Sequence, residues 1–313
     1  MMTQIPLPSN LVEDLRQVEQ IVVERTHSRA AVISVAGTRL LAPGSDRTHA
    51  ALVLLAAYTG NYQRDLILHA AAAVELIHAA TQTHDGLVDE ADRRHGRVQR
   101  GEWNHAVALM VGDYLFALAA GEMALSPDPR VISFYANAVM RITESTLEPL
   151  TALQPLEPAR AHHLERLSGS HGALFGAACR AGGVCVGVPS VQIDALGRFG
   201  DSLGVALRLA EEITDMMTFD GASLRAGVVS LPLIFAVAQG DAKRLTAALD
   251  SSDPVEQVWA CEQVRHYGIG PTRAEIARLT AQARVALVGV PPGEARETLV
   301  RALDYAERRS YGA

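Results

Sequence analysis

Apolar residues return every three or four positions along almost the whole chain, and this spacing constrains the fold more than any other feature. Leu11, Leu15, Val18 and Val22 give the first such stripe. Similar patterns follow at about 63–88, 104–125, 160–187, 192–217, 229–239, 254–266, 272–287 and 293–310. No segment shows the alternation bounded by turn residues that is typical of a strand. The pattern predicts an all-α fold.

Proline and glycine fall between these stretches but mark no linker. They cluster at 42–44, 126–129, 188–189 and 291–293. No Gly/Ser-rich tract, low-complexity segment or repeat divides the chain. With 313 residues, 49% of them hydrophobic, the chain can bury a sizeable core. We therefore expect a single domain over residues 1–313, built as one large helical bundle.

Charge and apolar run length exclude several classes of protein. A net charge of −7 argues against a nucleic-acid partner. The apolar stretches 50–57 and 228–238 are shorter than the roughly 20 residues that span a bilayer, and the first ten residues do not resemble a signal peptide. Three cysteines without a CxxC pair fit a reducing compartment. We expect a cytoplasmic protein with no integral membrane association.

Two carboxylates one helical turn apart form the first candidate site. Asp85 and Asp89 are separated by four positions, so both lie on one face of a helix. Oxygen ligands at this spacing suit Mg²⁺, which binds through one or two carboxylates together with substrate phosphates. Taken alone, such a pair is more often a solvated acidic face.

A second acidic turn, Glu211, Glu212 and Asp215, follows the apolar run 203–210 and favours the functional interpretation. Two inward-facing acidic turns on separate helices can hold metal ions between them and clamp a diphosphate. The chemistry would then be ionisation of a diphosphate ester, with metal neutralising the leaving group. Arg94 would supply a permanently charged fork for a phosphate.

At this point the sequence resembles the trans-isoprenyl diphosphate synthases, or polyprenyl synthetases. The matching segments, in the family's order, are 36–43, 78–96, 109–116, 170–174, 211–215 and 223–234. The resemblance implies an all-α isoprenoid synthase fold with a central cavity between the two acidic motifs, and usually a homodimer. It also implies a reaction in which an allylic prenyl diphosphate ionises over Mg²⁺ and the cation is captured.

The resemblance also assigns roles to individual residues. The catalytic carboxylates would be Asp85, Asp89, Glu211, Glu212 and Asp215, and all of these except Glu212 would bind metal. The candidate substrate-binding residues are Arg94, His78, Arg39, His95, Arg208 and Arg225. Arg208 replaces the family's glutamine, so it is either a new phosphate ligand or, as we favour, the partner of a neighbouring carboxylate.

Departures from the family pattern concentrate on the positive charges around the diphosphates. The family's three lysines are Thr38, Ser170 and Val228 here, and two of its arginines are Leu41 and His95. Each lost charge-assisted hydrogen bond is worth roughly 1.5–3 kcal/mol. A codon bias toward arginine explains why the chain has a single lysine, but not why these positions carry no cation. In the first acidic motif, a glycine at position 86 replaces the second aspartate.

These departures predict a Mg²⁺-dependent enzyme that ionises an allylic prenyl diphosphate with altered acceptor use, either terpene cyclisation or non-standard prenyl transfer. Two alternatives stay open. One is an ordinary chain-elongating polyprenyl diphosphate synthase whose acceptor site is rebuilt by Arg39, His78 and His95. The other is a catalytically degenerate isoprenoid-binding subunit of a heteromeric synthase.

The remaining histidines support weaker hypotheses. His162 and His163 are adjacent and lack the spacing of a zinc helix, so we interpret them as surface residues. His84, beside the first acidic motif, is better explained by packing than by catalysis. His171 would donate to a phosphate, act as a base or pack in the core.

Overall fold

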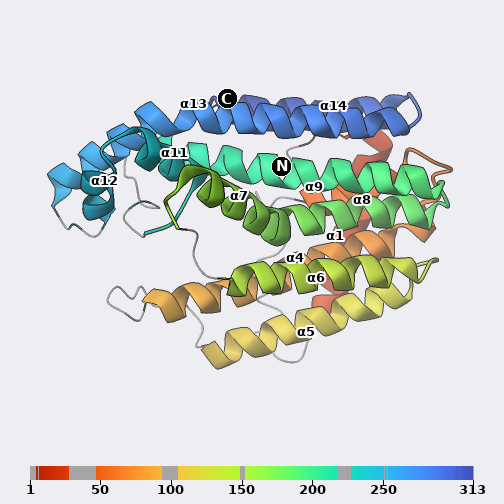
Figure 1. Ribbon diagram of the computed structural model, residues 1–313. Coiled ribbons are helices and arrows are strands. Elements are labelled where there is room, and N and C mark those ends of the chain that lie inside the picture. The colour runs from red at the N-terminus through yellow and green to blue at the C-terminus, as the bar shows by residue number, and fades with distance from the viewer. Residues whose placement is uncertain are drawn as a thin grey trace.

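The computed structural model describes residues 5, 7–27, 47–93, 105–148, 152–217, 224, 227–249, 251 and 253–312, except for the side chains of residues 85–93 and 105. Every regular element among these residues is a helix (Figure 1). The all-α prediction is therefore confirmed.

Three helices form the middle of the bundle: α3 (Thr48–Ala57), α8 (Ala173–Cys185) and α9 (Ser190–Met217). All residues of α3 are buried, which is expected of a helix that is apolar on every side. Helix α8 packs against both α3 and α9. A Cβ on Gly182 of α8 would lie 2.1 Å from the carbonyl oxygen of Val53, so glycine lets the two backbones approach closely.

Other helices cover the two sides of this layer. On one side lie α4 (Leu68–Arg93), α5 (His105–Ala124) and α6 (Arg130–Leu147). On the other lie α13 (Pro254–Ala286) and α14 (Glu294–Arg309) (Figure 1). One hydrophobic cluster contains residues of helices from α1 (Ser9–Thr26) to α14.

The remaining helices are shorter. They are η1 (Arg64–Leu66), α7 (Leu156–Leu167), η2 (Ser168–Gly172), α11 (Leu231–Gln239), α12 (Ala242–Leu249) and η3 (Leu287–Gly289). Helices α3, α6 and α12 have no counterpart among the predicted stretches. Helix α3 was not predicted because it is apolar on all sides and therefore lacks a one-sided stripe of apolar residues.

Helix α13 differs from its prediction because it continues through Pro271, where the pattern indicates two helices. A proline inside a helix removes one backbone hydrogen bond and costs roughly 3 kcal/mol. Packing of α13 against both α9 and α11 offsets that cost. A Cβ on Gly268 would lie 2.1 Å from the Pro232 carbonyl oxygen, so the contact with α11 requires glycine close to the proline.

Helix α5 contains one stretch, Ala106–Ala124, that is long and apolar enough to cross a membrane by length and composition. One-third of its most apolar window is buried within the fold. A single helix of this kind is weak evidence for a membrane span, because core helices of soluble proteins pass the same test. It packs against α4, and its exposed residues include Leu109 and Met110.

Candidate functional site

The first acidic motif lies on the C-terminal half of α4. The helix continues from Leu68 to Arg93, so Asp85 and Asp89 are one turn apart on it, as predicted, and Gly86 does not interrupt it. The structure does not describe the side chains of residues 85–93. Four predicted substrate-binding residues lie outside the described residues altogether: Arg39, Arg94, His95 and Arg225.

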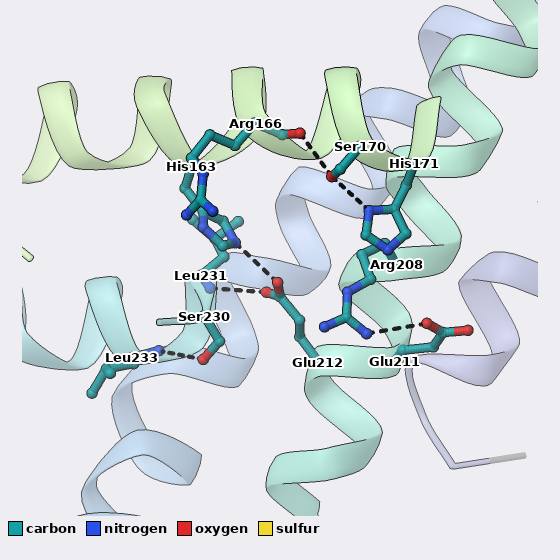
Figure 2. Close-up of polar contacts among 10 residues, drawn as sticks. All are labelled: His163, Arg166, Ser170, His171, Arg208, Glu211, Glu212, Ser230, Leu231 and Leu233. Carbon is teal, nitrogen blue, oxygen red and sulfur yellow. Dashed lines mark hydrogen bonds and ion pairs between the residues drawn. The ribbon is translucent and has the colours of Figure 1, made fainter. Parts of the chain in front are cut away.

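The second acidic motif lies on α9, where Glu212 is buried between two elements (Figure 2). One of its carboxylate oxygens accepts from His163 Nε2 at 2.9 Å, and the other accepts from the backbone N–H of Leu231 at 2.9 Å. His163 and Glu212 side chains are each 4% exposed. Glu212 therefore binds α7 on one side and satisfies an N–H at the start of α11 on the other.

Glu211, one position earlier, faces two arginines. Its two oxygens lie 3.3 Å from Arg208 Nη1, one turn back on α9, and 3.3 Å from Arg309 Nη1 at the end of α14. The salt bridge that we favoured for Arg208 is therefore present. Asp215 lies one turn further along α9 and is exposed.

These contacts bear on metal binding. All four oxygens of Glu211 and Glu212 have nitrogen partners. Within the part of the chain that the structure describes, no group of three or more histidine, cysteine, aspartate or glutamate side chains could hold a metal ion. A Mg²⁺ ion at these carboxylates would therefore have to compete with two arginines at Glu211 and with two buried donors at Glu212.

A π-helical turn, η2, connects α7 to α8 and carries Ser170 and His171. The Ser170 hydroxyl donates to the Arg166 carbonyl at 2.8 Å and also lies 2.8 Å from His171 Nδ1. Since the hydroxyl has one proton, His171 donates through Nδ1–H and leaves a lone pair on Nε2. Turns of this kind inside α-helices are frequent at functional sites.

Three histidines from different helices gather next to this turn. The rings of His49 on α3 and His78 on α4 are 4.4 Å apart, and His49 contacts Phe175 edge-on at 4.5 Å. Burial, with a smaller contribution from Arg47, lowers the pKa of His78 to about 4. Burial, followed by the nearby Arg208, lowers the pKa of His171 to about 3.

The pKa of His49 is also lowered well below its usual value, mainly by burial and then by His78 and His171. All three rings are therefore neutral at pH 7. His78 can donate or accept a hydrogen bond to a substrate.

His84 packs between α4 and α5, as we favoured. Its Nε2 lies 3.2 Å from the Leu109 carbonyl oxygen and 3.6 Å from Asp113. A Cβ on Gly112 would lie 2.1 Å from His84 Nε2, so glycine at position 112 leaves room for the ring.

Sequence reasoning missed three residues of the candidate site. His163 is 3% exposed, so its interpretation as a surface residue is wrong. His163 and Glu212 are 49 positions apart, so no local spacing pattern in the sequence links them. Arg309 reaches Glu211 through the packing of α14 on α9, and His49 lies in a helix that was not predicted.

The contacts of Glu212 predict a large loss of stability in the Glu212→Ala variant. The substitution leaves the Leu231 N–H and His163 Nε2 buried without partners, and each orphaned group costs about 1–3 kcal/mol. We expect the free energy of unfolding to fall by about 3 kcal/mol, measured by urea denaturation.

Glu211→Ala is the matched control for this measurement. Its carboxylate is 37% exposed and its ion pairs are partly screened by water, so we expect a loss below about 1 kcal/mol. Equal losses in Glu211→Ala and Glu212→Ala would contradict the structural role of Glu212.

Comparison with known proteins agrees with the fold and the motifs. Residues 31–264 match the sequence profile of the polyprenyl synthetase family. The chain is 31% identical to nonaprenyl diphosphate synthase of Mycobacterium tuberculosis, covering 94% of this chain and 91% of the relative. It is 29% identical to heptaprenyl diphosphate synthase component 2 of Geobacillus stearothermophilus, covering 97% and 98%.

Solved structures give the same result. A decaprenyl diphosphate synthase from Rhodobacter capsulatus has a TM-score of 0.84 and 32% identity, over 96% of this chain and 97% of that one. A polyprenyl synthase from Caulobacter crescentus, complexed with calcium and isoprenyl diphosphate, has a TM-score of 0.84 and 28% identity, over 96% and 99%. The chain is therefore a member of the polyprenyl synthetase family of prenyltransferases, with the all-α isoprenoid synthase fold.

Proposed function

We propose that the protein is a chain-elongating polyprenyl diphosphate synthase, which transfers the prenyl group of an allylic diphosphate to isopentenyl diphosphate. The observation that carries the proposal is similarity over nearly the whole of both chains to proteins named nonaprenyl and decaprenyl diphosphate synthases. These relatives favour elongation over the altered acceptor use that we predicted from the lost cations. In each cycle the allylic C–O bond breaks, the acceptor double bond attacks the allylic carbon, and a proton leaves.

Mg²⁺ belongs to this proposal through the first acidic motif. Asp85 and Asp89 lie one turn apart on α4, the spacing at which two carboxylates bind a divalent cation. Bound there, the ion would neutralise charge on the departing diphosphate. The solved relative that contains calcium and isoprenyl diphosphate supports a divalent cation at the site.

The buried histidines near the two acidic motifs contribute positioning rather than positive charge. His78 and His171 are neutral, so they offer hydrogen bonds to substrate. Two described arginines add positive charge nearby: Arg208 on α9, which lies beside the ring of His171 in Figure 2, and Arg47, which lowers the pKa of His78. Arg94 and Arg225 remain proposed diphosphate ligands.

Subunit association is the second part of the proposal. Large apolar side chains are exposed on and beside helices α5 and α6: Leu109, Met110, Leu125, Ile132, Met140 and Leu147. Exposed apolar surface on neighbouring helices is typical of a subunit interface. We propose that this face pairs two copies of the chain. A relative named component 2 of heptaprenyl diphosphate synthase favours a heteromeric enzyme as the alternative.

One experiment tests the proposed function. The purified protein is incubated with geranyl, farnesyl or geranylgeranyl diphosphate and Mg²⁺, with and without isopentenyl diphosphate. We expect longer prenyl diphosphates to form only when isopentenyl diphosphate is present. Release of pyrophosphate with a hydrocarbon or alcohol in its absence would instead support altered acceptor use.

Light scattering of the same preparation tests association. A dimeric, active preparation agrees with the homodimer, whereas a monomeric and inactive preparation would favour the need for a second subunit.

A further inference from the structure

We propose that Arg208 and Arg309 neutralise Glu211, and that two buried donors hold Glu212, so that these two glutamates of the second acidic motif bind no metal. The proposal rests on the proposed function, because it concerns how the same site handles a diphosphate. It differs from the resemblance to the family, which implies a metal ligand at Glu211.

The first step is that every oxygen of the two carboxylates already has a nitrogen partner. Glu211 has an arginine on each oxygen, and Glu212 has a histidine on one oxygen and a backbone N–H on the other. Glu212 is 4% exposed and joins α7, α9 and α11, so its release would leave buried donors without partners. Of the two, Glu212 is the more firmly held.

The second step is the charge balance. Two guanidinium groups, 27% and 25% exposed, face the single carboxylate of Glu211. A guanidinium is charged at any pH that the folded protein tolerates. A metal ion bound to Glu211 would therefore lie close to both guanidinium groups and would be repelled by them.

The third step is an open donor on Arg208. Its Nη1 faces Glu211, but its Nε–H is buried and has no hydrogen-bond partner among the described residues. A buried donor without a partner is rare and marks a position where an acceptor is missing. Figure 2 shows the guanidinium below the ring of His171 and joined to the carboxylate of Glu211. An enclosed water or a diphosphate oxygen would satisfy this donor, and neither requires an intervening metal.

The experiment measures Mn²⁺ binding by electron paramagnetic resonance, without turnover, in the presence of a non-reactive allylic thiodiphosphate. We expect Glu211→Gln to leave Mn²⁺ affinity within about twofold of the unaltered chain, because the carboxylate that it removes is bound by two arginines and is not a metal ligand. We expect Asp89→Asn to weaken it by about tenfold or more, since this change removes a ligand. A tenfold or greater loss in Glu211→Gln would overturn the proposal.

Removing the arginines provides the second, independent measurement. We expect Arg208→Gln and Arg309→Gln, alone and together, to let Glu211 bind additional Mn²⁺ per chain. Arg308→Gln is the matched control, because Arg308 is an exposed arginine beside Arg309 on α14. No gain in the double variant, with helicity preserved by circular dichroism, would also overturn the proposal.

The same data separate this inference from the proposed function. If the unaltered chain binds no Mn²⁺ at all, the metal-dependent part of the proposed function fails, and the gain in the arginine variants still decides the inference. If Mn²⁺ binds as expected but no prenyl diphosphate is elongated, the inference stands and elongation fails.

Discussion

The Asp89→Ala variant is expected to release pyrophosphate from an allylic diphosphate about a thousandfold more slowly than the unaltered chain. A divalent cation on a leaving diphosphate stabilises the transition state by several kcal/mol, and each 1.36 kcal/mol is a factor of ten in rate. If one motif holds the metal, loss of either of its carboxylates removes most of that stabilisation. The measurement is single-turnover release of pyrophosphate at saturating Mg²⁺.

Glu211→Gln is the matched comparison. It also removes one negative charge from an acidic motif, but from a carboxylate already bound by Arg208 and Arg309. We expect its rate to stay within about tenfold of the unaltered chain, because Glu211 is not a metal ligand in the proposed site and partly exposed ion pairs contribute only about 1 kcal/mol. A thousandfold loss in both variants would show that metal binds both motifs. No loss in Asp89→Ala would refute the metal assignment.

The helices that sequence could predict are those with a one-sided apolar stripe. Helix α9 is the best example: its predicted range, 192–217, differs from the observed Ser190–Met217 only at the start. The burial of Glu212 also follows from the apolar flank that precedes it. The i, i+3 pair of Arg208 and Glu211 could be anticipated because both residues lie on one helix face.

What sequence could not predict depends on how helices pack against each other. The partner of Glu212 is a histidine on α7, and the second partner of Glu211 is an arginine on α14. Neither has a spacing signal, since the contacts join distant parts of the chain. The family resemblance assigned metal binding by position, whereas the contacts of each carboxylate oxygen depend on residues outside the motif.

Acid is expected to destabilise the fold strongly through its buried histidines. Folding lowers the pKa of His78 to about 4 and that of His171 to about 3, from 6.5 in the unfolded chain. Below pH 6.5 the unfolded state therefore binds protons that the folded state does not. The free energy of unfolding is at its full value above about pH 6.5 and falls as the pH drops toward 4.

The size of the effect follows from the shifts. One pKa unit corresponds to about 1.4 kcal/mol, so at pH 4 each of the two histidines removes up to about 3 kcal/mol of stability. His49, whose pKa is lowered by the same burial, adds to the loss. For a domain stabilised by about 5–15 kcal/mol, this is a large fraction of the total. Urea denaturation at intervals between pH 7.5 and 4.5 measures the slope.

Two histidine variants separate this cause from the titration of carboxylates, which also destabilises folded proteins in acid. His171→Gln keeps a hydrogen-bonding side chain but cannot bind the proton, so we expect a flatter dependence of unfolding free energy on pH. The control is His162→Gln, because His162 is partly exposed. We expect this variant to show the same dependence of unfolding free energy on pH as the unaltered chain. Only groups whose pKa differs between the folded and unfolded states contribute to the dependence of unfolding free energy on pH. Parallel curves for His171→Gln and the unaltered chain would therefore show that the interior histidines do not cause the acid sensitivity.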